Sequence, residues 1–219
     1  MQHEVNFTTA GTISMNFRGR IEAAYQRSGN TLGWRFLYSA SKTLAGAPVA
    51  FIGLNPGGSV EEDMHGTYAM ERGSAYSRES WAGCAPSQHQ LQKQVLSLFA
   101  KLEIEPEDVL AGNLVPFRSR DWKSLKNRKQ SVQFGKELWT EVLQTSQPSL
   151  IVTMGALTTK ILSEMLNIRH LEKHPTGWGK VSAFRGEFEG GRLVGLPHLS
   201  RFGIMTRPQS SVYTDRLLT

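Results

Sequence analysis

The stretch Val49-Ala-Phe-Ile-Gly-Leu-Asn-Pro-Gly-Gly-Ser59 decides the fold. An apolar run over 50–54 ends abruptly at the Asn-Pro-Gly-Gly sequence, which predicts a buried strand that leads into a turn. In open α/β sheets, ligand sites lie at the carboxyl ends of the strands. Asn55 is the one polar side chain of this turn, whose glycines let the backbone approach a ligand closely. We therefore expect Asn55 to position a ligand, although a Gly-Pro turn without a site fits the same residues.

The composition indicates a basic protein without disulfides. The chain has 219 residues, which suits one domain over 1–219 with a sizeable core. Its formal net charge of +6 and its pI near 9.6 favour an acidic partner, and nucleic acid is the first candidate. The lone cysteine, Cys84, excludes an internal disulfide and an all-cysteine metal or iron–sulfur site. Because the sequence contains neither a signal-like N-terminus nor a long apolar run, we expect a cytoplasmic, nucleoid-associated protein that makes no membrane contact.

Predicted strands alternate with predicted amphipathic helices along most of the chain. Strands are expected at 49–54, 108–114, 150–154, 181–188 and 192–196. Helices are expected at about 18–28, 30–44, 87–102, 132–144, 156–166 and 211–218, the third of them opened by a capping box of Ser87 and Gln90. Residues 1–17 show no period, and the irregular segment 59–86 is typical of a functional or mobile loop. This alternation predicts an α/β protein, a three-layer α/β/α sandwich around a mostly parallel sheet.

Polar residues stand at the carboxyl ends of three of the predicted strands. Asn55 follows the first strand, Asn113 ends the second, and His198 follows the last. The carboxyl ends of parallel strands meet at one edge of a sheet. We therefore expect these three side chains, far apart in sequence, to share one pocket.

Three segments around these residues resemble the signatures of one family, in the right order. Residues 53–57, Gly-Leu-Asn-Pro-Gly, are similar to the first signature of the uracil-DNA glycosylase superfamily, in the version of its mismatch-specific (thymine-DNA) and single-strand-selective branches. Asn113, followed by Leu-Val-Pro-Phe, resembles the asparagine that reads the pyrimidine edge. Residues 197–202, Pro-His-Leu-Ser-Arg-Phe, resemble the second signature, a His-x-Ser loop that contacts the base and enters the duplex. The resemblance implies the fold of this superfamily, in a monomer that uses neither metal nor cofactor.

The resemblance also implies a reaction, the hydrolysis of the glycosidic bond between a base and deoxyribose. As this bond lengthens, positive charge develops on the sugar and negative charge on the base, so both ends need stabilisation. Asn55 would hold a water on the sugar face, and His198 would donate a hydrogen bond, as a neutral imidazole, to the base oxygen. Asn113 would pair with the edge of the extruded base, whereas a turn cap is the alternative for an asparagine at a strand end. Further substrate contacts are expected from Gly53, Leu54, Pro56 and Gly57.

An aromatic ring is expected to stack on the flipped base, as is usual for extracted bases. The candidates are Tyr68, Tyr76 and Trp81, and the sequence does not choose firmly among them. We favour Tyr76. For each of the three rings, a place in the core is the alternative.

Contacts with the DNA backbone are expected from two segments. In the second signature, Ser200 would hold a phosphate, and the wedge that enters the duplex would consist of Leu199, Arg201 and Phe202. In the basic run 118–129, phosphate contacts that weaken steeply with salt are expected from Arg118, Arg120 and Lys123. The alternative for this run is a solvated loop.

Two departures from the family pattern bear on the substrate and the wedge. Gly57 stands where some branches carry an aromatic residue that blocks groups attached to the pyrimidine C5. The pocket is therefore expected to admit C5-modified pyrimidines as well as uracil. Prokaryotic members of the superfamily excise hypermodified cytosines of phage DNA, so both base-excision repair and anti-phage defence fit the resemblance. Leu199 replaces the proline that usually follows the histidine, which alters the wedge.

Other classes of protein fit the sequence less well. The first strand is followed by neither the glycine fingerprint of a Rossmann protein nor a P-loop, and no Gly-x-Ser-x-Gly supports a serine hydrolase. His170 and His174 are four residues apart, but without an evident third ligand they indicate surface residues rather than a metal site. The remaining rival is a non-catalytic nucleic-acid-binding relative that keeps the fold and the basic face.

Overall fold

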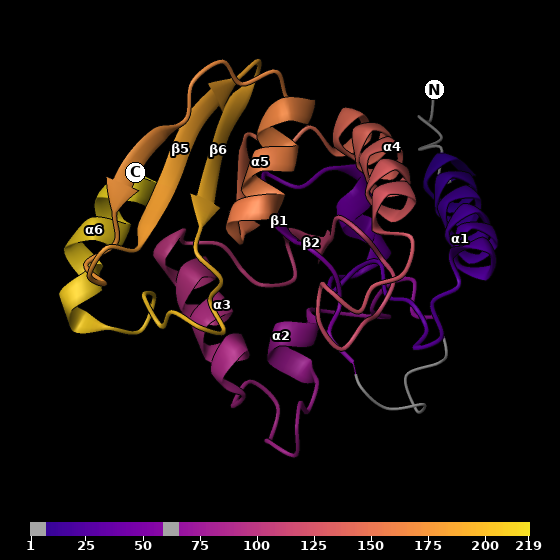
Figure 1. The fold of residues 1–219 in the computed structure, drawn as a ribbon, viewed down its shortest axis with the longest axis horizontal. Helices are drawn as coiled ribbons and strands as arrows, with labels where there is room; N and C mark the ends of the chain where they lie inside the picture. Colours follow the sequence, from indigo (N-terminus) through magenta and orange to yellow (C-terminus); the bar gives the residue numbers. More distant parts are fainter. Residues whose placement is uncertain (1–7, 59–65) are drawn as a thin grey trace, which may run out of the picture.

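One six-stranded sheet forms the centre of the structure, a computed structural model that describes residues 8–58 and 66–219 (Figure 1). The strands are β1 (Val49–Gly53), β2 (Val109–Asn113), β3 (Leu150–Met154), β4 (Glu172–Pro175), β5 (Ser182–Phe188) and β6 (Gly191–Leu196). Their order across the sheet is β2-β1-β3-β6-β5-β4. The first four strands in this order are parallel, whereas β5 is antiparallel to both of its neighbours. The sheet is thus mostly parallel, as the sequence predicts.

Both faces of the sheet are apolar. Side chains alternate between the two faces along a strand, and in the buried strands the residues that point to each face are mostly apolar. In β1, Ala50 and Ile52 pack into one core layer, whereas Val49 and Phe51 pack into the other. All five residues of β1, β2 and β3 are buried. Each of these short strands is therefore a mostly apolar run, interrupted only by Asn113 at the end of β2 and Thr153 in β3, and this pattern predicts them.

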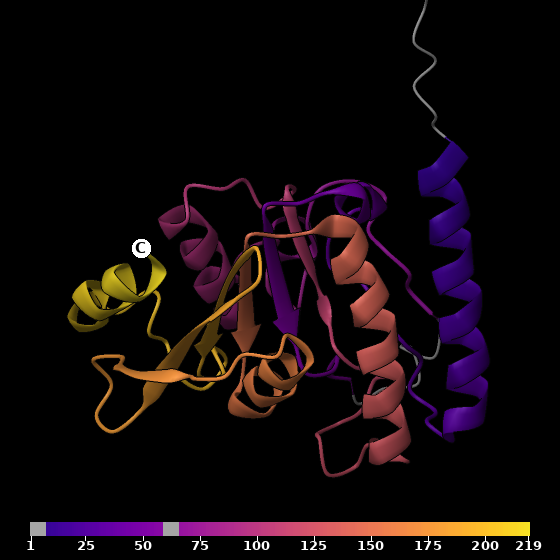
Figure 2. The same ribbon diagram turned by 90° about the horizontal axis from the view of Figure 1, so that it is seen from above.

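Helices cover both faces and complete a three-layer α/β/α sandwich (Figure 2). The Ala50 face carries α1 (Thr8–Ser28), α4 (Arg128–Ser146), α5 (Ala156–Met165) and the 3₁₀ helix η1 (Ser41–Ala45). The opposite face carries α3 (Gln90–Lys101), α6 (Pro208–Leu218) and the short α2 (Ala75–Arg78). The predicted fold class is confirmed.

The strand register brings the carboxyl ends of the parallel strands to one edge. Gly53 of β1 pairs with Asn113 of β2, and Ile52 pairs with Thr153 of β3. Thr153 in turn pairs with Gly195 of β6. The turns that follow these strands therefore leave the sheet side by side, which is the geometry that a shared site requires.

The prediction of a helix over 30–44 is wrong for all residues before Ser41. Residues 34–40 run extended beside β2, where the Tyr38 amide donates to the Ala111 carbonyl over 2.7 Å. On its other side the same segment bonds to residues 67–70, with the Leu37 amide donating to the Tyr68 carbonyl over 3.0 Å. Only η1 is helical here. Pairing on both sides satisfies the backbone, and this long-range pairing outweighs the local helical spacing of the apolar residues.

Several element boundaries also differ from the prediction. Helix α1 already begins at Thr8 within the segment predicted to be irregular, and residues 1–7 lie outside the described part. The capping box of α3 is formed by His89 and Gln92 rather than by Ser87 and Gln90. Strand β4, of sequence Glu-Lys-His-Pro, was not predicted because an exposed edge strand shows no apolar alternation. Within the described residues, no helix is long and apolar enough to cross a membrane.

Candidate functional site

Asn55 lies two residues after the end of β1, and hydrogen bonds hold the nitrogen of its side-chain amide. Its Nδ2 donates to Ser119 Oγ over 2.8 Å, to the Pro56 carbonyl over 3.1 Å and to the Phe117 carbonyl over 3.4 Å. No described residue donates a hydrogen bond to its Oδ1. The protein therefore orients the amide by its nitrogen and leaves its oxygen as an acceptor for a ligand or a water.

Asn113 ends β2, and its side chain lies across Gly53 of the neighbouring strand. A Cβ on Gly53 would overlap Asn113 Oδ1, so only glycine at position 53 leaves room for the amide. Asn113 is 6% exposed, yet its side-chain amide has no hydrogen-bond partner among the described residues. The turn-cap alternative therefore does not hold. The amide atoms of Asn113 are not among the fully buried polar atoms that lack a partner in the described residues, so they still reach the surface and can pair with a ligand.

His198 follows β6, and its imidazole is held by the neighbouring serine. Ser200 Oγ lies 2.7 Å from His198 Nδ1, and when this hydroxyl donates to Nδ1 the hydrogen of the neutral ring is on Nε2. The residue is accessible at the surface, but the protein packed around the ring lowers the pKa of His198 below 6.5. The positive charge of Arg201 lowers this pKa further. At neutral pH the ring is therefore an uncharged donor.

The three polar residues occupy one edge of the sheet, in the order β2, β1, β6, with β3 between the last two. Met154 of β3 reaches toward Gly53, and His198 Cδ2 lies 3.9 Å from the Cβ position of Gly155. Asn113, Gly53 and Met154 thus form a continuous row toward His198. Two amides and an imidazole therefore lie at the same edge of the sheet, whereas their sharing of one pocket stays a prediction.

The three aromatic candidates lie in different places. Tyr76 is 4% exposed in the core layer on the Asn113 side of the sheet, where its ring packs against Phe51, Phe99, Trp81 and Tyr38. Tyr68 packs on Phe36 in the opposite layer, away from Asn113. Trp81 is half-buried and donates through Nε1 to Glu79. Tyr76 is therefore the best placed of the three, but it serves mainly as a core residue.

Sequence patterns do not point to Tyr38, whose half-buried ring lies against the ring of Tyr76. The two rings stack at 5.5 Å and 21°, and the Arg35 guanidinium lies 4.1 Å from the Tyr38 centroid. Arg35 also forms a bidentate pair with Glu79. Tyr38 presents the accessible end of the aromatic stack on the Asn113 side. The apolar residues of 34–40 are spaced as in a helix, so the sequence predicts a helix there and not the extended segment that pairs with β2.

The prediction that Leu199 of the second signature forms part of the wedge is wrong. Leu199 is fully buried in the core layer on the Asn113 side and anchors the loop there. Arg201 is exposed and Phe202 is half-buried, so both reach the surface. The Ser200 hydroxyl is engaged by His198. The part of this loop that can meet a ligand is therefore His198, Arg201 and Phe202.

The basic run also divides by role. Arg118 Nη1 donates to the Gly57 carbonyl over 3.0 Å, so this side chain holds the Asn-Pro-Gly turn. Arg120 and Lys123 are exposed and form no ion pair with a described acid, although the charge of Lys123 acts on the nearby Asp121; exposed cations suit phosphate contact. The last residues of the run form the first turn of α4 rather than a loop.

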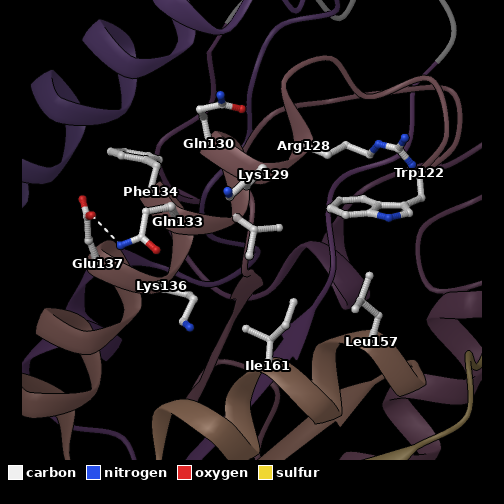
Figure 3. A pocket seen from close by; sticks show the side chains of 11 residues that line it. Trp122, Arg128, Lys129, Gln130, Gln133, Phe134, Lys136, Glu137, Leu157 and Ile161 are labelled. Carbon is white, nitrogen blue, oxygen red and sulfur yellow. Dashed lines mark hydrogen bonds between the residues drawn. The ribbon is translucent and has the colours of Figure 1, made fainter.

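A cavity of about 780 Å³ opens between α4 and α5 beside this run (Figure 3). Its apolar floor comes from Val132, Leu157 and Ile161, and Trp122 forms one wall. Three cations, Arg128, Lys129 and Lys136, line it against one acid, Glu137. The cavity lies on the other side of the sheet from the Asn113 side chain. It extends the basic surface and is separate from the polar edge site.

The described part of the chain contains no group of three or more His, Cys, Asp or Glu side chains that could hold a metal ion. His174 lies on the edge strand β4, next to Glu172 at 3.5 Å, and not on a helix with His170.

The structure defines an open α/β protein with polar side chains at the carboxyl ends of its parallel strands, the edge where ligands bind in such sheets. The family model of the uracil DNA glycosylase superfamily matches residues 42–217, which include β1, β2 and the segment 197–202. The chain belongs to the uracil-DNA glycosylase superfamily. A comparison with curated proteins found no match. Membership indicates DNA glycosylase activity and DNA binding, whereas the branch within the superfamily stays a prediction.

Proposed function

We propose that the protein hydrolyses the N-glycosidic bond of a pyrimidine flipped out of DNA and leaves an abasic site. The observation that carries this proposal is the Asn113 amide, which belongs to a residue only 6% exposed, has no hydrogen-bond partner in the described part of the chain and still reaches the surface. A base edge that offers a donor and an acceptor would pair with it. Asn113 would therefore select the base, and the residues on either side would act on the bond.

Asn55 and His198 would serve the two ends of the breaking bond. Asn55 Oδ1 would hold the attacking water, because Nδ2 is tied to Ser119 and the amide cannot turn freely. The neutral His198 would donate from Nε2 to the base oxygen on which negative charge collects. Asn55, Asn113 and His198 include no amine that could attack the sugar as a nucleophile, which favours a monofunctional hydrolase.

The substrate class follows from the open side of the Asn-Pro-Gly turn. A Cβ on Gly57 would meet no atom within 4 Å, so the space beside the turn is free of protein in the described part of the chain. A pyrimidine with a group on C5 would place that group there. C5-modified pyrimidines, including hypermodified cytosines of phage DNA, are therefore proposed beside uracil, in repair or in anti-phage defence.

The test is a single-turnover assay on single- and double-stranded DNA that contains uracil, 5-hydroxymethyluracil or a C5-modified cytosine. Treatment with alkali cleaves the strand at abasic sites. We expect cleavage at a modified base with the wild-type protein and none with Asn55→Ala. Gly57→Tyr would lose excision of the C5-modified bases while keeping that of uracil. Tight binding without abasic sites on any of these substrates would support the non-catalytic relative instead.

A further inference from the structure

A rigid turn at the far end of the sheet lies level with the His198 loop. Strand β4 runs in the same direction as β6, so its carboxyl end lies at the edge that carries the site. Pro175 of β4 pairs with Ser182 of β5. Phe184 of β5 pairs with Gly195 of the antiparallel β6, so Ser182, two residues earlier, lies level with Pro197, two residues later. The turn over 176–181 is therefore a neighbour of the His198 loop.

This turn presents Trp178 at its tip and is held in place from several sides. The Val181 amide donates to the Trp178 carbonyl over 3.0 Å, and Thr176 Oγ1 donates to the Val181 carbonyl over 2.8 Å. Gly177, with φ of +70°, packs so closely on the first residues of α6 that a side chain there would overlap them. The position of Trp178 is thus fixed before any ligand arrives.

Trp178 joins the His198 loop through Phe202. The two rings meet edge to face, with centroids 6.2 Å apart and an interplanar angle of 80°. The Arg207 guanidinium lies 4.6 Å from the Trp178 centroid. Both rings are half-buried, so each keeps part of its surface open. We call this pair, Trp178 and Phe202, the aromatic ledge.

The charges around the aromatic ledge are positive. Arg201 and Lys180 are exposed beside it, and Arg207 covers part of the indole. Half-exposed aromatic rings among cations are the combination that binds unpaired bases and their phosphates, because every base has a face that can stack. Leu199, the other apolar residue of the loop, is buried and supplies no such surface.

We propose that the aromatic ledge stacks on the base that loses its partner when the target base is extruded, while Arg201 and Arg207 contact the adjoining phosphates. This proposal rests on the proposed function, since an unpaired base arises only if a base leaves the duplex. Extrusion costs a few kcal/mol, and stacking on the ledge offsets part of that loss. Trp178 is thus a positioning residue for DNA and stands apart from the reacting atoms.

The test uses a duplex that already lacks the target base and therefore needs no turnover. It carries a tetrahydrofuran abasic site with 2-aminopurine opposite, whose fluorescence reports stacking. We expect Trp178→Ala to weaken binding about 10-fold, the loss expected for one stacked base, and to remove most of the fluorescence change that the wild-type protein causes. Trp178→Phe should restore most of both. Val212→Ala, which removes an exposed apolar side chain from α6, is the matched control and should change neither.

The outcomes separate the ledge from the proposed function. A wild-type protein that excises a base while Trp178→Ala binds the abasic duplex equally well, with the same fluorescence, would overturn the ledge. So would a wild-type protein that fails to bind this duplex. If Trp178→Ala loses affinity and fluorescence change while no substrate of the panel is cleaved, the ledge stands and the glycosylase proposal fails. Unchanged thermal melting of both Trp178 variants would show that the loss is not one of folding.

Discussion

The side chain of Asn113 lies over Gly53 on the neighbouring strand, in the place that a Cβ at position 53 would occupy. Two segments of the family pattern that are sixty residues apart thus form one close contact. The glycine is required because it leaves room for an amide and not because the strand needs flexibility. The contact ties the first signature to the residue proposed to select the base.

The first prediction follows from this contact. Gly53→Ala would push the Asn113 amide out of place, and we expect a loss of about 10-fold or more in kcat/KM on the excised base. Gly19→Ala, on the exposed side of α1, is the matched control, because its new methyl group would meet no atom within 4 Å. Single-turnover rates of the two variants check this. Equal losses in both would indicate that the loss does not come from displacement of Asn113.

The second prediction concerns His198 as the donor to the departing base. His198→Ala should reduce the rate of excision by roughly 10²- to 10³-fold, the loss typical of one such donor. Affinity for DNA should barely change, because the ring contributes to the transition state and not to the binding of the duplex. Single-turnover kinetics and fluorescence anisotropy measure the two quantities. A variant that excises the base as fast as the wild type would refute the assignment.

The third prediction concerns the charge of His198. Burial and then Arg201 lower its pKa, so its NMR titration should have a midpoint below 6.5, and Arg201→Gln should move this midpoint upward. The neutral donor therefore persists as the pH falls through 6.5, and excision should stay constant there. By linkage, stability is lost only as the pH falls from 6.5 through the lower folded pKa. A wild-type midpoint at or above 6.5 would contradict the proposed environment; a spectrum of His198→Gln assigns the resonance.

The fourth prediction addresses the exposed cations Arg120 and Lys123. Each phosphate contact contributes about −0.9 to the slope of log K against log salt for duplex DNA. The double variant Arg120→Ala/Lys123→Ala should therefore have a slope shallower by about one to two. Lys42→Ala is the control, because Lys42 pairs with Asp108 near the start of β2, at the opposite edge of the sheet. An unchanged slope would assign the two cations to a solvated surface.

The parts of the fold that the sequence predicts well are those in which local pattern and tertiary environment agree. The buried parallel strands are mostly apolar runs, and Leu150–Met154 is predicted to the residue. The place of Asn55, Asn113 and His198 at one edge of the sheet follows from the rule that parallel strands end at one edge. Both predictions needed only the strand pattern and the order of the chain.

The parts that the sequence does not predict depend on pairing between distant segments. The apolar residues of 34–40 are spaced as in a helix, but this segment pairs with β2 and with residues 67–70. The positions of Tyr38 and Arg35 therefore could not be predicted from the sequence. Leu199 lies between a catalytic candidate and two exposed residues, and only the packed core shows that it faces inward. The stretch 59–65, where part of the predicted loop falls, lies outside the described residues.

The fifth prediction concerns the ion pair that supports the aromatic stack. Arg35 has 7% and Glu79 29% of its side chain exposed, and the guanidinium holds both carboxylate oxygens while lying against Tyr38. Burial raises the pKa of Glu79, but the hydrogen bonds and charge of Arg35 outweigh it and hold that pKa below 4.5. Arg35→Met leaves the carboxylate partly buried without its cation and with Trp81 Nε1 as its remaining side-chain donor, and we expect a loss of about 2–3 kcal/mol of unfolding free energy, below the range for a fully buried pair.

The double variant Arg35→Met/Glu79→Gln separates charge from packing. It removes the unpaired charge, so it should be more stable than Arg35→Met in urea denaturation at neutral pH. Because the folded pKa of Glu79 is lowered, the stability that the pair contributes is present above pH 4.5 and is lost as the pH falls through the folded pKa. The difference between wild type and Arg35→Met should therefore shrink in acid. A difference that stays constant from pH 7 to pH 3 would assign the effect to the contact of Arg35 with Tyr38 instead.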